Sequence, residues 1–197
     1  ELVKDILVNE PCVDISNFTA SAQIGFGYFH RNNSNFPFKE GIIIRSGNAS
    51  YTGGAYTGTN FSTTGSNTSD PDLQNIMAAN GLTSQNKDAS FVKFNFVPTV
   101  SDFSFNFLFA SQEYGQYQCS SSYVDAFAFI LTNLETGETQ NLAVVPGTNT
   151  MISVTTVKNQ TFNGTCPSLN VNYFGKYNGP TTAPYPHGPN NSEINLM

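Results

Sequence analysis

The sequence predicts a mostly-β single domain over residues 1–197, an antiparallel β-sandwich or jelly roll with one or two short helices. Two runs of alternating phenylalanines, at 103–109 and 127–129, each place their rings on one side of a strand. A β-branched run at 41–44 and short apolar segments between Gly, Pro and Asn turns are typical of further strands. The 39% of hydrophobic residues supplies enough material for a core.

The composition favours an extracellular β protein over a cytosolic enzyme. Charged residues make up only 11% of the chain, less than half of the usual quarter, and Asn, Ser, Thr and Gly supply the polarity instead. The net charge of -6 and the pI near 4.7 exclude a basic nucleic-acid footprint and are compatible with a divalent cation. The only histidines are His30 and His187, and no Cys-x-x-Cys pair exists to hold zinc.

In the first third of the chain we expect two strands after a short helix. Residues 2–8 have apolar side chains four apart, as on one helical face, and Pro11 ends this predicted helix. Residues 13–15 begin a strand, and a loop follows the aromatic, glycine-rich stretch at 25–29. The run at 41–44 predicts a strand that is buried on both faces.

A second helix is predicted over residues 71–80. Asp70 is a suitable N-cap, Pro71 occupies the first helical position, and Gly81 closes the end. The segment 91–97 then predicts another strand.

The last third of the chain contains strands separated by turns. A turn at 134–138 joins two strands, of which the second is 141–145. A second turn at 146–147 leads to a β-branched strand at 152–157, and the sequence becomes irregular after Lys158.

Three cysteines leave an odd count: Cys12, Cys119 and Cys166. In a secreted protein we expect Cys119 to pair with Cys166, which closes a loop of roughly 47 residues and stabilises the fold by a few kcal/mol. Cys12 is then the remaining cysteine, buried or bonded outside this segment. The alternative is that all three are free thiols.

The best-placed acidic residues lie in the loop between the two phenylalanine runs, which holds Glu113 and Asp125 at its ends. If the flanking strands pair, the loop brings both carboxylates together. Ser120–Ser122 and backbone carbonyls could then complete the roughly six to eight oxygen ligands that Ca²⁺ needs. The structural alternative is that Asp125 caps a turn and Glu113 forms a surface ion pair. A glycosidase pair is a third interpretation, supported by nothing beyond the two carboxylates themselves.

A series of phrases runs along the chain from Leu2 to about Gly179. They read LVKDILVN-x-PCVDISN, NFPFKEGIIIRSGN, DLQ…NKDASFVKFNFVP, FLFASQEYGQYQC, VDAFAFILTN, LAVVPGTNTMISV and NGTCPSLNVNYFGKYNG. Their order and spacing resemble the bacterial choice-of-anchor L domain family, a module of secreted surface proteins. The Ser-Asp-Pro-Asp phrase is similar to the family's acidic loop, so the resemblance adds Asp70 and Asp72 as candidate calcium ligands.

The resemblance implies a secreted or surface-attached bacterial protein, similar to those that gliding and biofilm-forming Bacteroidota export by type IX secretion. It implies no defined reaction. Two differences matter. Gln112 and Gln116 stand where the family's FASEEYGE phrase has carboxylates, so Glu113 and Asp125 remain. The family also continues into closing strands, which would begin after Met197.

A shorter similarity concerns sugar binding. The phrase VDAFAFIL at 124–131 is similar to the Asp-Gly-x-Ala-Phe-Phe strand of legume-type lectins. It implies that Asp125 accepts hydrogen bonds from sugar hydroxyls. Tyr114, Tyr117 or Tyr123 would stack against the sugar ring. The alternative is that the phenylalanines of the phrase are ordinary core residues.

The Tyr-, Thr- and Gly-rich stretch at 49–61 includes Tyr56, and it is either a recognition loop or a flexible connector. It belongs to a long polar segment that reaches residue 70.

The first functional hypothesis is a non-enzymatic, calcium-stabilised module of a bacterial cell-surface adhesin that presents loops to a glycan or protein partner. The alternative is a structural subunit whose strand edges pair with neighbouring subunits in a surface filament or a secretion- or gliding-associated complex. A carbohydrate-active enzyme ranks third. We expect an extracellular mature chain, without a signal peptide and without membrane insertion, because no basic start and no long apolar run occur.

Overall fold

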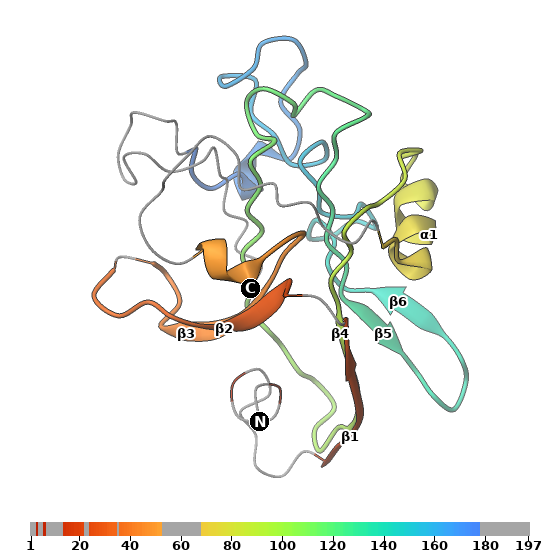
Figure 1. Cartoon of the computed structure of the whole chain (residues 1–197). Helices are drawn as coiled ribbons and strands as arrows, with labels where there is room; N and C mark the ends of the chain where they lie inside the picture. Colours follow the sequence, from red (N-terminus) through yellow and green to blue (C-terminus); the bar gives the residue numbers. More distant parts are fainter. Residues whose placement is uncertain are drawn as a thin grey trace. The chain divides into compact units, whose positions relative to one another are not determined.

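The computed structural model (Figure 1) describes residues 3, 6, 14–21, 24–34, 36–52 and 68–177. The chain forms two compact units. Unit 1 comprises the described residues up to Ser69 together with Asn86–Phe103, and unit 2 comprises Asp70–Gln85 and the described residues from Ser104 onward. Strands predominate over helices, and each sheet is a small antiparallel pair, which confirms the prediction of a mostly-β, antiparallel fold. The helix predicted at 2–8 lies largely outside the described residues.

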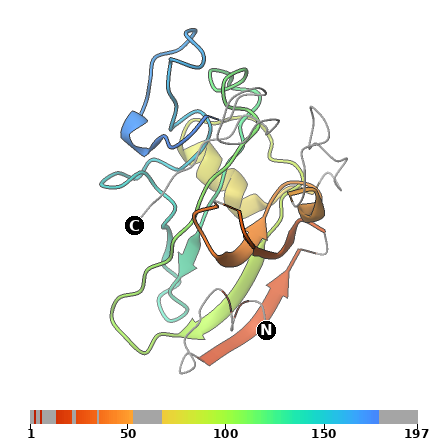
Figure 2. The same cartoon turned by 90° about the vertical axis from the view of Figure 1, so that its left-hand side faces the viewer.

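In unit 1, strand β1 (Asp14–Ala20) pairs antiparallel with strand β4 (Val92–Val97), and Figure 2 shows the two side by side. The register shifts between Ser16 and Thr19, where Asn17 has a positive φ of 51°. A β-bulge of this kind adds one residue to a strand, and asparagine tolerates the left-handed region better than most residues. Both strands were predicted from the sequence and are confirmed.

Unit 1 also contains a hairpin of strands β2 (Phe26–His30) and β3 (Glu40–Ile44). The prediction that the β-branched strand is buried on both faces is wrong, because Ile44 is 40% exposed and Ile42 and Ile43 are half-buried. Within the described residues β3 pairs with β2 alone, so it is an edge strand. A 3₁₀ turn, η2 (Ala49–Thr52), follows it.

Helix α1 (Pro71–Ala79) of unit 2 has the ends that the sequence predicts. The Asp70 carboxylate oxygen Oδ1 accepts a hydrogen bond from the Leu73 backbone N–H at 2.9 Å, which satisfies one of the free donors of the first turn. Gly81 follows the helix with a positive φ of 77°, a conformation that glycine adopts without steric strain. Asn80 also ties the helix end to the rest of unit 2, because its Oδ1 accepts from the Met151 N–H at 3.0 Å.

Replacing Asp70 with alanine is expected to lower the free energy of unfolding by about 1 kcal/mol, since the N-cap acceptor is lost. Asp70→Asn is the matched control, because asparagine also caps helices well. Chemical denaturation of the three proteins measures the difference. Equal stability of Asp70→Ala and the wild type would contradict a stabilising role for this cap.

Strands β5 (Ile130–Thr132) and β6 (Thr139–Asn141) form the hairpin that the sequence predicts around the turn at 134–138. Its turn contains Gly137 at a φ of 76°. The second strand lies two residues earlier than predicted from the apolar run at 141–145, because the register starts next to the turn at Thr132 and Thr139.

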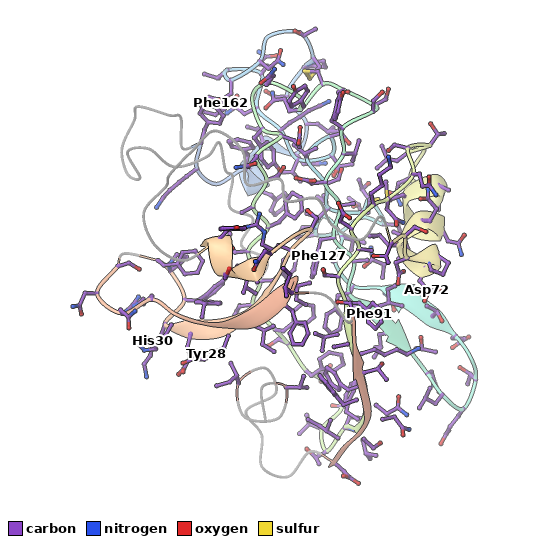
Figure 3. All side chains as sticks on the ribbon, in the orientation of Figure 1. Tyr28, His30, Asp72, Phe91, Phe127 and Phe162 are labelled. Carbon is purple, nitrogen blue, oxygen red and sulfur yellow. A yellow bond between two sulfur atoms is a disulfide. The ribbon has the colours of Figure 1, made fainter. Side chains whose placement is uncertain are left out.

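The two phenylalanine runs meet through their rings in unit 2. Phe105 stacks on Phe129 at 4.0 Å between ring centroids, and Phe107 lies 5.1 Å from Phe127, which is labelled in Figure 3. Neither run is a named strand, so the prediction of two core strands here is wrong. The stacked rings bring the two segments together without a continuous ladder of backbone hydrogen bonds.

The strand predicted at 152–157 is a turn for most of its length. The Ser153 N–H donates to the Thr156 Oγ1 at 2.9 Å, and the Thr156 hydroxyl donates to the Met151 carbonyl at 2.7 Å. Hydroxyl side chains that bond to nearby backbone groups compete in this way with strand pairing. Only a short bridge remains, between Ser153 and Ala126.

The core of unit 2 gathers around the residues that follow the two phenylalanine runs. Its buried members are Phe109, Tyr114, Val145, Ile152, Val154 and Val157. Half-buried aromatic residues from the 3₁₀ turn η3 (Val171–Tyr173) and the segment after it pack against this cluster. Among the described residues, no helix has the length and apolar character that crossing a membrane requires.

Candidate functional site

Residues 111–125, here called the central loop, lie in unit 2 between the two phenylalanine runs. The loop begins with consecutive turns, in which the Tyr117 N–H donates to the Glu113 carbonyl at 2.9 Å and the Ser120 N–H donates to the Tyr117 carbonyl at 2.8 Å. At its far end the loop returns to the core, because the Asp125 carbonyl accepts from the Val154 N–H at 3.3 Å. The start of the loop is therefore folded on itself, and its far end is tied to the core.

Residues 159–177, here called the clamp segment, hold the middle of the central loop. Cys119 and Cys166, the two cysteines that the sequence analysis paired, form a disulfide with a Cα–Cα distance of 5.6 Å. The buried Gln118 side chain donates to the Asn159 carbonyl at 2.8 Å, and the Asn163 side chain donates to the Gly115 carbonyl at 2.7 Å. The same Asn163 side chain also donates to the Gln116 carbonyl at 3.3 Å. One covalent bond and three hydrogen bonds thus restrain the loop. Cys12 lies outside the described residues.

Gly115 is a position where the loop and the clamp segment approach closely. Its φ is +80°, and a Cβ atom at this position would lie 2.5 Å from the Tyr177 hydroxyl. Tyr177 in turn stacks on Phe162 at 4.2 Å between centroids; Figure 3 labels Phe162. Both the backbone conformation and the space available therefore favour glycine at this point of the loop.

Glu113 and Asp125 are brought together through Ser111. The Ser111 hydroxyl donates to the Asp125 Oδ2 at 2.5 Å, and the same hydroxyl oxygen accepts from the Glu113 N–H at 2.9 Å. Ser111 is only 4% exposed, so these bonds form in a nearly dry environment. Ser111 thus links the Asp125 carboxylate to the Glu113 backbone, and the Asp125 charge acts on the Glu113 carboxyl.

The electrostatics of the pair are unfavourable without a counter-charge. Burial raises the pKa of the Glu113 carboxyl above its usual range, and the negative charge of Asp125 raises it further. The Glu113 Oε2 atom is buried and has no hydrogen-bond partner within the described part of the chain. No lysine, arginine or histidine occurs in the sequence between Lys93 and Lys158. The site therefore combines two acidic groups, one of them incompletely satisfied, in a segment that has no cationic side chain.

A hard cation fits the charge of this pair and its oxygen chemistry. Ca²⁺ prefers carboxylate, hydroxyl and carbonyl oxygens, and it takes about six to eight of them. Glu113, Asp125 and Ser111 provide side-chain oxygens, and backbone carbonyls or water would have to supply the rest. Within the described residues, no group of three or more His, Cys, Asp or Glu side chains is placed to hold a metal ion.

The four predicted metal ligands are not assembled into one cluster. Asp70 caps helix α1, and Asp72 is an exposed residue of the first helical turn, labelled in Figure 3. Local helix capping explains the Ser-Asp-Pro-Asp phrase, so these two residues are removed from the candidate set. Glu113 and Asp125 remain.

Glu113→Gln is expected to stabilise the metal-free protein slightly at neutral pH. A raised pKa means that the folded protein binds more protons than the unfolded chain between the ordinary carboxyl pKa and the raised one, so stability falls as pH rises through this window. Glutamine lacks the charge and removes this loss, although solvent screening keeps the effect small. Thermal melts in chelator, from about pH 4, near the ordinary glutamate pKa, upward through neutral pH, measure it. The prediction would be contradicted if the melting temperature of the wild type rose with pH relative to that of Glu113→Gln.

The predicted ligand-binding tyrosines have different environments. Tyr114 is fully buried, with Phe174 at 5.2 Å and Phe109 at 6.4 Å between ring centroids, so the prediction that it contacts a ligand is corrected to a core role. Tyr117 and Tyr123 lie together in the central loop at 4.7 Å between centroids. Tyr56 lies outside the described residues.

Sequence reasoning missed the polar residues that shape the site. Ser111 and Gln118 both belong to the phrase FLFASQEYGQYQC, but nothing in that phrase indicates that these two polar side chains are buried. It also missed a surface cluster on the β2–β3 hairpin, where the Tyr28 hydroxyl donates to the Glu40 carboxylate at 2.6 Å. Tyr28 and His30 are labelled on this hairpin in Figure 3. The alternation of polar side chains along β2 was a usable signal for that cluster.

Comparison with known proteins gave one family. The family model described as Choice-of-anchor L domain matches residues 1–196. No curated protein and no solved structure matches the chain significantly. The family match covers the central loop and the clamp segment together with unit 1.

Proposed function

The chain belongs to the Choice-of-anchor L domain family, a family of surface-associated modules, and from this membership we propose that it acts as a non-enzymatic, extracellular module of a bacterial cell-surface adhesin. Its working part is the central loop, which binds Ca²⁺ at Glu113 and Asp125 and is presented to a partner outside the cell.

The observation that carries this proposal is the covalent attachment of the central loop to the clamp segment. Disulfides persist in oxidising environments, as in exported and cell-surface proteins, and are rare in the cytosol. The Cys119–Cys166 bond is therefore consistent with a chain that works after export. It restrains a loop rich in Gln, Ser and Tyr, residue types that supply hydrogen bonds and contact area to partners.

The calcium part of the proposal rests on the Glu113–Asp125 pair. The buried, unsatisfied Glu113 oxygen and the raised pKa of this carboxyl support it, because a bound cation would satisfy the oxygen and favour the charged form. A cation that bound here would link the start of the loop to its end. It would thereby add to the restraint that the disulfide provides.

Size measurement in solution tests the proposed role against its strongest alternative. A surface module of this kind should remain a monomer of about 21.4 kDa at all concentrations, with and without calcium. Gel filtration with light scattering gives the mass directly. Growth into larger species with rising concentration would contradict the proposal and favour a structural subunit.

The alternative of a structural subunit is supported by the strand edges. Each described sheet has two strands, so every strand has one edge without a partner strand among the described residues. Such edges can accept a strand from a neighbouring molecule. In that case the surface complex would assemble by strand pairing.

A further inference from the structure

We propose that Tyr117 and Tyr123 of the central loop form a stacking platform for one sugar ring of a neutral glycan. This inference rests on the proposed function, because it names the partner of the same loop. A pyranose ring has one face of C–H groups, which packs on an aromatic ring, and a rim of hydroxyls, which need neutral hydrogen-bonding groups nearby. The central loop offers both.

The two tyrosines have the geometry of a platform. Their centroids are 4.7 Å apart and their planes are inclined by 43°, so the rings contact each other and leave no gap between them for a ligand. Tyr123 is 57% exposed, whereas Tyr117 is half-buried and packs against it. The Gln116 amide donates to the Tyr117 hydroxyl at 3.1 Å, which fixes the supporting ring. One open aromatic face remains, that of Tyr123.

The platform is held in place before any ligand arrives. Cys119, two residues after Tyr117, is bonded to the clamp segment, and the neighbouring Gln118 is buried and hydrogen-bonded. A restrained loop loses little conformational entropy on binding, which favours affinity for a small contact area.

The charges around the platform select against acidic glycans. Asp125 lies two residues after Tyr123, Glu113 lies at the start of the same loop, and the sequence from Lys93 to Lys158 contains no basic side chain between those two lysines. Where no cation is bound to them, these carboxylates would repel a uronic acid or a sulfated sugar. The hydroxyl and amide groups of Gln116 and Ser120–Ser122 are neutral and suit sugar hydroxyls.

A sugar fits this surface better than a protein or an organic cation does. Tyr123 is the only exposed large hydrophobic side chain in the described segment 104–125, whereas a stable protein interface buries about 800 Å² on each partner. A quaternary ammonium group is usually enclosed by several aromatic rings, and two rings that already touch cannot enclose it.

Affinity electrophoresis in native gels tests the platform. The gels contain a neutral polysaccharide (a mixed-linkage β-glucan, a xylan or a mannan) or, for comparison, polygalacturonate. At least one neutral polysaccharide should retard the wild-type chain, and Tyr123→Ala should weaken the binding by about tenfold, since one stacking contact is lost. Tyr51→Ala is the matched control, because Tyr51 is 54% exposed but belongs to η2 in unit 1. It should bind like the wild type.

Three results would overturn the platform. The first is that none of the three neutral polysaccharides retards the chain, which would leave a protein partner for the loop. The second is equal retardation of Tyr123→Ala and the wild type. The third is a preference for polygalacturonate. Melting with calcium is measured in parallel on Tyr123→Ala. A calcium response that equals the wild type's shows that the cation site is intact, so that a failure of sugar binding is distinguished from a failure of the proposed calcium module.

Discussion

Replacing Cys119 and Cys166 together by alanine is expected to lower the free energy of unfolding by about 4 kcal/mol, the chain-entropy value for a loop of this length. The two cysteines are 47 residues apart in sequence, and their bond joins the central loop to the clamp segment. Without it, the unfolded chain gains freedom, and the loop is held by hydrogen bonds alone. The double variant is used because a single substitution would leave a free thiol. Urea denaturation measures the change.

The wild type with its disulfide reduced is the matched control, and it should unfold at the same urea concentration as the double variant. Cys119→Ala/Cys166→Ala should also lose most of the proposed binding of the central loop. An unchanged midpoint in the double variant would contradict the stabilising role assigned to this disulfide.

Calcium is expected to raise the melting temperature of the wild type by about 5–10 °C at one hundred times its dissociation constant. A ligand that binds only the folded state stabilises it by about 2.7 kcal/mol at that concentration, and 1 kcal/mol shifts the melting of a protein of this size by about 2–4 °C. Asp125→Asn should abolish the response, because the carboxylate that faces Ser111 loses its charge. Differential scanning fluorimetry with calcium and with excess chelator measures it.

Asp72→Asn is the control for the calcium prediction, because Asp72 is an exposed carboxylate on helix α1. This variant should respond to calcium as the wild type does. An equal response of Asp125→Asn would show that any bound ion lies elsewhere, and no response in the wild type would remove the cation site.

Features that depend on neighbouring residues were predictable from the sequence. Helix α1 follows from Asp70 as the N-cap, Pro71 at the first helical position and Gly81 beyond the end, all within one short stretch. The turns at Gly137 and Gly147 follow in the same way, because both glycines have positive φ angles. The family was also recognisable from the order of its phrases, and the family match confirms it.

Features that depend on tertiary partners were not predictable. The run at 152–157 has strong β propensity, but Ser153 and Thr156 satisfy backbone groups locally and form a turn. β propensity describes residues that fit a sheet and does not say whether a partner strand is present. Tyr114 was assigned to a ligand for the same reason, since nothing in the sequence shows that Phe109 and Phe174 pack around it.

The candidate site was partly predictable. The proximity of Glu113 and Asp125 followed from a loop fixed between two apolar runs. The role of Ser111, which bonds to both residues, could not be predicted, because a single serine carries no sequence signal. The fixed conformation of the loop depends on the Gln118–Asn159 and Asn163–Gly115 hydrogen bonds. These bonds span sequence separations of 41 and 48 residues, so they exist only after folding.

The central claim, that this chain works at the cell surface, is tested most directly by labelling intact cells. Cells that produce the native protein are treated with a membrane-impermeant biotin reagent that reacts with lysines, and a cytosolic protein of the same cells serves as the control. The proposed function predicts that the chain is labelled on intact cells as fully as after lysis, with Cys119 and Cys166 oxidised. The proposal would be contradicted if the chain, like the cytosolic control, were labelled only after lysis.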